Sequence, residues 1–572
     1  MKRKLFNWIV LVLLLAPSVQ AQDIGQLKDQ KPVSFRGTLG GGANFFASNE
    51  AYATRDPFAW NLYGNFTPSF YGISMPFSFV VTQYTNSYTQ PFSQFGISPS
   101  YKWAKLHLGY RNISFSPLLF DGQSFLGGGI ELAPKGFYFG AFYGKLNQAI
   151  SEDTTNMARL QPQYARNGYG VKVGVGGEHQ NFSLQYLHAK DDIGSIQRIE
   201  DSLTTLLPQE NSVVGSSWKF SFFKKQLSFS GDAAVSLLSR DLSYETIDSI
   251  GDTKLPVILQ KLMPVNYSSV LSWSGQAQVG LMLKNLNAMV GYRRVQPDFK
   301  SLGVPYALDD VEMISGNLNT TFNQGKINLN AAVNNQRNNL ENMLSSTLVT
   351  RTGNLSLNTF VSQHVNVNMN VTGVRILQQD GLLELSDSVR MDQMMFTAVL
   401  APSLNFSDAS RQHTVSGSFT YTSLNDHNPV TKEQTNGNNF SSSVNYGLYF
   451  LQQYMGVNTT VLYSVYGQQN SRYQSLGLDV GANAQLLKDR SLSLQGSVGY
   501  FLNKATDSPT GNNLTFSFNG NYAVWNSHSL GIYASYMITP PVNLNPLNDI
   551  NHVPYAVNSK LFSGGITYAY NF

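Results

Sequence analysis

Apolar and polar residues alternate one by one over long stretches of this chain. In residues 227–237, for example, Leu227 and Phe229 share one parity, and serines occupy the positions between and beside them. A period of two indicates β-strands with one face in an apolar medium. The clearest stretches are residues 227–237, 365–371, 492–500 and 514–522. They run longer than the roughly five or six residues typical of strands in soluble sandwiches, so they favour a membrane barrel.

The last eleven residues show the same alternation and end on an aromatic residue. One face of this stretch carries Phe562, Gly564, Ile566, Tyr568, Tyr570 and Phe572. The pattern resembles the closing strand of bacterial outer-membrane barrels. This resemblance implies an antiparallel transmembrane β-barrel that is surrounded by outer-membrane lipid and inserted by the barrel-assembly machinery. The assembly signal would be Ile566, Tyr568, Tyr570 and Phe572.

Connections between the expected strands alternate between tight turns and long polar links. Tight turns are expected at residues 179–181, 223–225, 284–286, 323–325 and 488–490. Long links are expected at residues 145–168, 190–211, 239–267, 296–312, 335–350, 378–389, 423–438, 504–512 and 539–558. Outer-membrane barrels have short periplasmic turns and longer outer loops, so both termini are expected in the periplasm.

The spacing of these connections predicts the size of the barrel. It places about seven strands before residue 168 and about 19 after it, an even total near 26, as bacterial single-chain barrels usually have. Pro68, Pro76 and Pro99 interrupt the early segments, and each removes a hydrogen-bond donor from the sheet. Residues 56–103 are therefore either wall strands or a stretch that folds partly into the lumen. The prediction is an all-β barrel of about 22–26 strands.

The amino terminus has the layout of a secretory signal. Basic residues at positions 2–4 precede an apolar run at residues 8–16, and Ala21 ends a small-residue cleavage site. We expect a signal peptide at residues 1–21, a periplasmic lead-in at 22–33 and the barrel at 34–572. Without the three basic residues the formal net charge of +4 falls to +1, which gives no support for nucleic acid as a partner.

Composition agrees with a lipid-embedded barrel. Charged residues make up 13% of the chain, against roughly 25% in soluble domains, yet the mean hydropathy is −0.18. A barrel strand offers only every second residue to lipid, so it needs few charges and no long apolar run.

The chain offers few residues for catalysis or metal binding. It contains no Cys, and its eight His residues form no H-E-x-x-H motif. Gly96 and Ser98 begin a Gly-x-Ser stretch that lacks the second Gly of a nucleophile elbow. The carboxylate pairs at 191–192 and 309–310 fall in predicted loops, where solvated charge is the commoner role. We expect no cofactor, no metal and no enzymatic activity.

Function is most readily placed in the lumen. Six ionisable residues fall on the polar parity of their strands: His107, Arg111, Glu131, Lys172, Asp232 and Asp479. Ionisable groups on the lipid face cost roughly 2–4 kcal/mol near the midplane, so these six are expected to point inward. They are either parts of a solute path or isolated ion pairs and solvated groups. Most other inward residues are Asn, Ser, Thr, Gln and Gly, which predicts a wet and nearly neutral lumen.

A barrel of this size encloses more space than its own side chains fill, so it is either an open pore or a plugged one. Residues 239–267 are our candidate plug, because Val257, Ile258 and Leu259 make this link unusually apolar for a solvated loop. We expect this loop to fold onto or into the barrel mouth.

Several early segments resemble a group of uncharacterised outer-membrane proteins of Bacteroidota. The likeness lies in residues 70–79, 90–99, 107–111 and 115–117. It implies an outer-membrane barrel and supplies no activity. Four Asp-Ser/Thr-apolar motifs also look like the O-glycosylation sites of that phylum. They begin at Asp153, Asp201, Asp248 and Asp387.

The sequence therefore predicts an outer-membrane channel or transport barrel that passes small polar solutes. The alternative is a barrel with a plugged lumen that anchors a secretion, surface-assembly or adhesion protein through its outer loops. The solute, the oligomeric state and the state of the lumen stay open at this point.

Overall fold

The structure is a computed structural model of the 572-residue chain. It describes residues 32–49, 55–71, 73–83, 94–151, 162–177, 179–196, 206–250, 252–304, 308–469, 471–506, 508–525, 527–539 and 559–572. The expected signal peptide, most of the lead-in, the motifs at Asp153 and Asp201 and the link at 540–558 lie outside the described residues.

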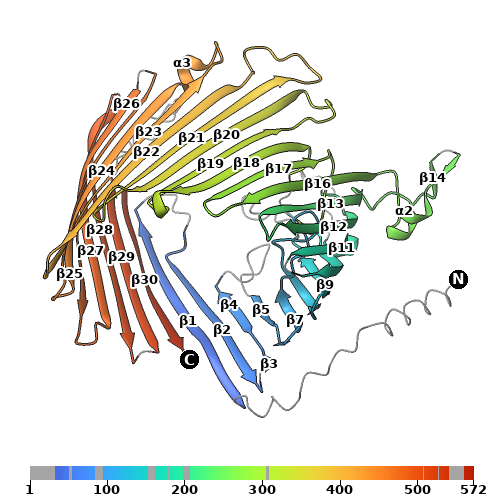
Figure 1. The fold of residues 1–572 in the computed structure, drawn as a ribbon, viewed down its shortest axis with the longest axis horizontal. Coiled ribbons are helices and arrows are strands. Elements are labelled where there is room, and N and C mark those ends of the chain that lie inside the picture. The colour runs from blue at the N-terminus through green and yellow to red at the C-terminus, as the bar shows by residue number, and fades with distance from the viewer. Residues whose placement is uncertain are drawn as a thin grey trace.

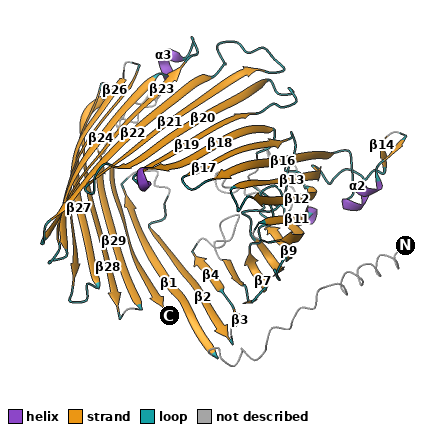
Figure 2. Cartoon of the chain, in the orientation of Figure 1, coloured by secondary structure: helices purple, strands orange, loops and turns teal. Residues whose placement is uncertain are grey.

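Long antiparallel strands form nearly all of the described structure (Figure 1, Figure 2). The strands of the wall are β1 (Val33–Ser48), β2 (Phe58–Phe70), β3 (Ile73–Ser74), β4 (Phe77–Thr82), β5 (Gln94–Ile97), β6 (Ser100–Tyr101), β7 (Ala104–Arg111), β8 (Phe125–Leu132), β9 (Phe137–Asn147), β10 (Arg166–Gly176), β11 (Gln180–Asp191), β12 (Glu210–Phe222), β13 (Leu227–Ser239), β16 (Ser269–Met282), β17 (Leu286–Val295), β18 (Val311–Phe322), β19 (Ile327–Arg337), β20 (Ser346–Phe360), β21 (Val365–Asp380), β22 (Asp392–Ser407), β23 (Arg411–Asp426), β24 (Gly437–Phe450), β25 (Met455–Gln468), β26 (Ser471–Leu486), β27 (Leu492–Ala505), β28 (Ser508–Val524), β29 (His528–Thr539) and β30 (Ser559–Asn571).

These strands close into one barrel, because β1 pairs with β2 on one side and with β30 on the other. The short pieces β3 and β4 are one strand broken at Pro76, and β5 and β6 are one strand broken at Pro99. The 28 labelled strands of the sheet therefore make a closed antiparallel transmembrane barrel of 26 strands. The predicted fold class is confirmed, with seven strands before residue 166 and 19 from there on.

The prolines interrupt the early strands without displacing them from the wall. Pro68 lies within β2 and pairs with Phe35. The described parts of residues 56–103 belong to wall strands, so the alternative that this stretch enters the lumen is wrong for them.

Turns and loops follow the expected alternation. The five tight turns that the sequence predicts all connect adjacent strands, and the start of β1 and the end of β30 lie at the same short-turn end. One predicted long link is wrong, since β27 and β28 pair almost to their tips and leave only residues 506–507 between them. Polar residues in this stretch continue the two strands instead of forming a loop.

The two faces of the wall differ as the alternation predicts. On β30, Ile566, Tyr568 and Phe572 are exposed on the outer face, whereas Thr567 pairs with Gly42 of β1 on the opposite parity. The ring of Phe572 packs edge-on against that of Phe35, with centroids 5.2 Å apart. The aromatic end of the chain thus fastens the seam at which the barrel closes.

Among the described residues, helix is confined to short pieces: α2 (Val257–Leu262), α3 (Lys432–Thr435) and single 3-10 turns at Ile193–Ser195 and Asn323–Gly325. Within the described residues, no helix is both long and apolar enough to span a membrane. A small hairpin of β14 (Ser249–Ile250) and β15 (Thr253–Lys254) accompanies α2. Both elements extend from the outside of the barrel near β13 and β16 (Figure 1).

Candidate functional site

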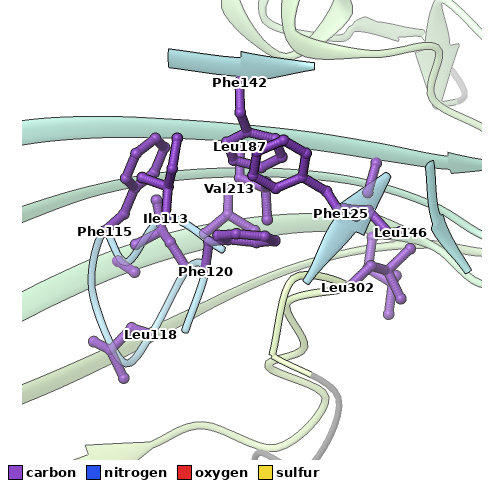
Figure 3. Packing of buried hydrophobic residues seen from close by; sticks show 14 of the residues in the cluster. Ile113, Phe115, Leu118, Phe120, Phe125, Phe142, Leu146, Leu187, Val213 and Leu302 are labelled. Carbon is purple, nitrogen blue, oxygen red and sulfur yellow. The ribbon is translucent and has the colours of Figure 1, made fainter. Parts of the chain in front are cut away.

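Residues 112–124, which connect β7 to β8, fold into the barrel and form what we call the plug. Their apolar side chains Ile113, Phe115, Leu118, Leu119 and Phe120 are all buried. They pack with inward side chains of β8, β9, β11, β12, β13 and β17 in one cluster (Figure 3). The members from the wall and the neighbouring loop are Phe125, Phe142, Leu146, Leu187, Ala189, Val213, Ala234, Leu238, Val295, Phe299 and Leu302.

The direction of this packing shows that the plug lies in the lumen. Leu187 on β11 and Val213 on β12 are fully buried against the plug. Their neighbours of opposite parity, Leu184 and Val214, are exposed on the outer face. The plug therefore occupies the inner side of the wall, where the sequence predicts only polar contacts.

Glycines on the inner wall make room for the plug. A Cβ atom at Gly170 of β10 would lie 2.6 Å from the ring of Phe142 and 2.7 Å from that of Phe115. A Cβ atom at Gly215 of β12 would lie 2.5 Å from the Leu119 side chain. Both distances are shorter than real Cβ contacts, so these two inward positions accept the plug only as glycine.

A second loop, residues 296–304 after β17, holds the plug from its far side. Ser301 Oγ donates a hydrogen bond of 2.5 Å to the carbonyl of Leu119, and Phe120 forms a parallel bridge with Gly303. The backbone N–H of Leu302 in turn donates to Asn211 Oδ1 of β12 at 3.0 Å. The carbonyl of Leu119 and the N–H of Leu302 thereby find partners, as burial requires.

Two of the predicted lumen residues fasten the plug to the wall. Lys172 Nζ donates 2.7 Å to the carbonyl of Phe115. Asp232 Oδ1 accepts hydrogen bonds from Ser116 of the plug at 3.1 Å and from Ser217 of β12 at 2.5 Å. Its Oδ2 accepts from Gln276 of β16 at 2.8 Å. Both residues point inward, and both stabilise the plug through charge-assisted hydrogen bonds.

Two further predicted residues, His107 and Glu131, form a buried chain beside the plug. His107 Nε2 lies 2.7 Å from Glu131 Oε1, and His107 Nδ1 lies 3.1 Å from Ser98 Oγ. Tyr138 donates 2.9 Å to Glu131 Oε2, and Lys105 Nζ is 3.5 Å from Glu131 Oε1. The order Ser, His, Glu matches that of a hydrolase triad, but Ser98 is only 5% exposed, so a substrate carbonyl cannot reach it. These contacts tie together β7, β8 and β9.

The remaining two predicted lumen residues occupy separate places. Arg111 donates 2.8 Å to Ser78 Oγ and 3.3 Å to the carbonyl of Pro76, where it bridges the break between β3 and β4. Asp479 on β26 pairs across the sheet with Thr460 and Gly499, far along the wall from the other five. The structure thus gathers four of the six around the plug and leaves Arg111 and Asp479 apart.

Two cavities line the inner wall between the plug and the short-turn end. The first has a volume of about 380 Å³ and is bordered by Lys172, Ser183, Lys219, Asp232 and Arg293, among others. The second, of about 350 Å³, lies toward the turn between β8 and β9 and shares Lys172 and Ser183 with the first.

The inner wall from β18 to β30 has a different character. Its inward residues are mainly Asn, Ser, Thr, Gln and Gly, and many carry hydrogen bonds across the sheet, such as Asn358 to Asn368 at 2.6 Å and Asn445 to Thr460 at 2.8 Å. Exposed inward residues include Asn317, Asn319, Asn330, Asn368, Gln495, Ser517 and Asn519. This half of the lumen is uncharged over most of its area and accessible to water.

The loop that the sequence proposes as a plug lies elsewhere. Residues 240–268, here called the outer lobe, contact the outward side chains of the wall: Ser212 Oγ donates 3.0 Å to the carbonyl of Leu262, and Met263 packs on the outward Leu237. The lobe extends away from the barrel (Figure 1). The prediction that residues 239–267 fold into the mouth is therefore wrong. Met263 and Val265 are buried against the outside of β13, whereas Val257 and Ile258 stay exposed.

Sequence reasoning missed the plug. It also missed Ser98, which contacts His107, and Lys219 and Arg293, which line the first cavity. A signal for the plug exists in the five apolar residues between positions 113 and 120, flanked by the two short strands β7 and β8. Lys219 and Arg293 occupy the polar parity of β12 and β17, so strict alternation would have placed them in the lumen.

Comparisons of this chain with protein-family models and with curated proteins return no match. Among solved structures, the translocation pore of the P pilus usher PapC matches with a TM-score of 0.35 and 10% identity over 94% of this chain and 99% of that chain. OccK9 (OpdG) of Pseudomonas aeruginosa matches with a TM-score of 0.32 and 10% identity over 70% and 98%. A bacterial polysaccharide outer membrane secretin matches with a TM-score of 0.27 and 11% identity over 60% and 97%. At this identity the likeness concerns the barrel alone.

Proposed function

We propose that this protein is an integral outer-membrane barrel that passes small polar solutes along the neutral half of its lumen. The observation that carries the proposal is the contrast between the two halves of the inner wall. The plug packs on β8–β17, whereas inward amides and hydroxyls such as Asn319 and Asn519 are exposed along β18–β30. A solute that exchanges water for these groups loses little hydrogen bonding during passage.

The physical setting supports a membrane location. Apolar side chains are exposed on the outer face of strand after strand, including Leu355, Val461 and Ile532. Such a surface is stable in lipid and would aggregate in water. We place the short turns and both termini in the periplasm, with the chain inserted by the barrel-assembly machinery. In this proposal the Ser98, His107 and Glu131 contacts are structural, and the protein is not an enzyme.

Planar-bilayer conductance of the purified barrel tests the proposal, with neutral sugars of increasing size as probes. We expect a steady conductance with weak ion selectivity that small sugars reduce and large ones do not. Replacing residues 113–123 by a short Gly-Ser link should raise the conductance, because this removes the plug core. Deletion of residues 244–264 from the outer lobe is the matched control. A barrel that is folded but silent in both forms would contradict a channel.

The outer lobe favours a second function, in which the barrel anchors a protein partner. Val257, Ile258 and Tyr267 are exposed by 62%, 70% and 76%, although they belong to a loop that leaves the barrel. Exposed apolar side chains of this kind are typical of protein interaction sites. Under this alternative, isolation from membranes should return a stoichiometric partner that the 244–264 deletion loses, and conductance should stay low.

A further inference from the structure

Two adjoining cavities under the plug make up what we call the basic groove. The cavities of about 380 and 350 Å³ share Lys172, Asn181 and Ser183, so they lie next to each other along β10 and β11. We define the groove by the cations that border them, Lys135, Lys172, Lys219 and Arg293. The groove faces the short-turn end of the lumen, opposite the side on which residues 113–120 pack.

Charge in this groove is unbalanced. Four cations border it and only one carboxylate, that of Asp232, lines either cavity. Both oxygens of that carboxylate already accept hydrogen bonds from Ser116, Ser217 and Gln276, which fixes it to the wall and the plug. Asp232 is therefore held in place by uncharged donors rather than drawn toward the cations.

None of the four cations forms an ion pair among the described residues. Lys172 donates to the carbonyl of Phe115. The buried Nε of Arg293 has no hydrogen-bond partner among the described residues. An unpaired donor buried beside like charges is costly, and a bound anion removes that cost.

Neutral donors and acceptors surround these charges. Asn181, Ser183, Ser230 and Gln278 border the first cavity, and Gln278 Nε2 donates 3.0 Å to Ser230 Oγ. Such amides and hydroxyls bind the hydroxyl groups of a polyol. The cavity volumes fall in the range of about 300–1,000 Å³ that small-molecule sites occupy.

We propose that the basic groove binds a small anionic polyol, with its carboxylate or phosphate on Arg293 and Lys219 and its hydroxyls on the neighbouring amides. The guanidinium of Arg293 suits either anion, because it presents parallel N–H donors. The groove would concentrate such solutes at the short-turn mouth of the passage. This inference rests on the proposed channel for its biological role, although binding itself is independent of conductance.

Titration calorimetry on the folded barrel in detergent tests this inference. The probes are D-gluconate, glucose 6-phosphate and glucose, which share a polyol and differ in the charged group. We expect the two anions to bind and glucose to bind far more weakly. Preference for gluconate or for glucose 6-phosphate then identifies a carboxylate or a phosphate as the physiological group. Equal binding of glucose would overturn the proposal.

Variants assign the binding to the groove. Lys219→Gln and Arg293→Gln should each weaken anion binding by about tenfold, the effect of losing one charge-assisted hydrogen bond. Arg293→Lys keeps the charge but loses the paired donors, so its anion affinity should lie between that of the unchanged protein and that of Arg293→Gln. The matched control is Lys326→Gln, in the turn after β18, which removes the same charge away from the groove. A heat-dependent gel shift verifies folding of each variant.

The outcomes separate this inference from the proposed function. The proposed binding site would be overturned if folded Lys219→Gln and Arg293→Gln kept the same anion affinity. It would also be overturned if Lys326→Gln lowered the affinity equally. A barrel that binds gluconate or glucose 6-phosphate yet stays silent in bilayers would support the groove and contradict the channel.

Discussion

Replacement of Phe120 by Ala tests how firmly the plug is held. The Phe120 side chain is fully buried, and its ring centroid lies 4.4 Å from that of Phe142 on β9 and 6.3 Å from that of Phe115. It stands between the wall and the second loop, because Phe120 also bridges to Gly303. The substitution would leave a cavity at the centre of this contact.

The expected effect can be estimated from core substitutions of this type. Phe to Ala at a buried site costs about 3–5 kcal/mol. Phe120 belongs to the plug and not to a wall strand, so the cost should fall on docking of the plug while the strand hydrogen bonds keep the barrel closed. Since each 1.4 kcal/mol is about tenfold, the undocked population should rise by roughly two to three and a half orders of magnitude.

Thiol labelling can measure this population. The chain has no Cys, and Ser116 of the plug is 1% exposed, so Ser116→Cys provides a single protected reporter. When undocking is fast relative to labelling, the rate of reaction with a water-soluble maleimide follows the undocked population. Adding Phe120→Ala should raise that rate steeply. The control is Phe516→Ala, which removes a ring from the outer face of β28.

The reasoning would be refuted if folded Ser116→Cys/Phe120→Ala reacted no faster than Ser116→Cys alone. A faster rate in the Phe516→Ala control would equally show that labelling reports general loosening of the barrel. Only acceleration that is specific to Phe120 supports a plug held by its own apolar core.

Two further substitutions and one deletion have defined outcomes. Gly170→Val should displace the plug, because a Cβ atom there lies 2.7 Å from the Phe115 ring, so single-channel conductance should rise. The control Gly353→Val should leave the conductance unchanged, because a Cβ atom there meets no atom within 4 Å. Phe572→Ala should lower the folded yield in an assembly assay, since the ring contacts of Phe572 with Phe35, Phe66 and Tyr570 are lost, each worth about 0.5–1.5 kcal/mol beyond its buried area. Deletion of residues 244–264 should not alter conductance, because the outer lobe packs on the outside of β13; a larger conductance would restore the gate that the sequence predicts.

Much of the fold follows from local pattern. Alternation with a period of two is a property of neighbouring residues, so it identifies the strands and the outward aromatic face of β30 without knowledge of the tertiary structure. It limits the barrel to about 22–26 strands, and the structure has 26. The short turns are equally local. The error at residues 504–512 arose because polar composition favours a loop, whereas pairing between β27 and β28 extends both strands.

The lumen could be predicted only in part. Alternation assigns His107, Glu131, Lys172 and Asp232 to the polar parity of their strands, and in the structure Lys172 and Asp232 bond to the plug. It does not show that Lys172 and Asp232 hold a plug, because their partners Phe115 and Ser116 come from a loop whose sequence has no strand period. The same limit explains the error over the outer lobe: an apolar loop must be buried, but composition does not say on which side of the wall.

The sequence by itself determined a Cys-free barrel of about 22–26 strands with a polar inner face and an apolar outer one, because each strand carries its own alternation. Only the tertiary structure decided where the loops go. The plug fits where Gly170 and Gly215, from strands far apart in the chain, leave space on the inner wall for Phe115 and Leu119. Closure of the sheet likewise brings Lys219 and Arg293 beside Lys172, and such a convergence of distant positions has no local sequence signal.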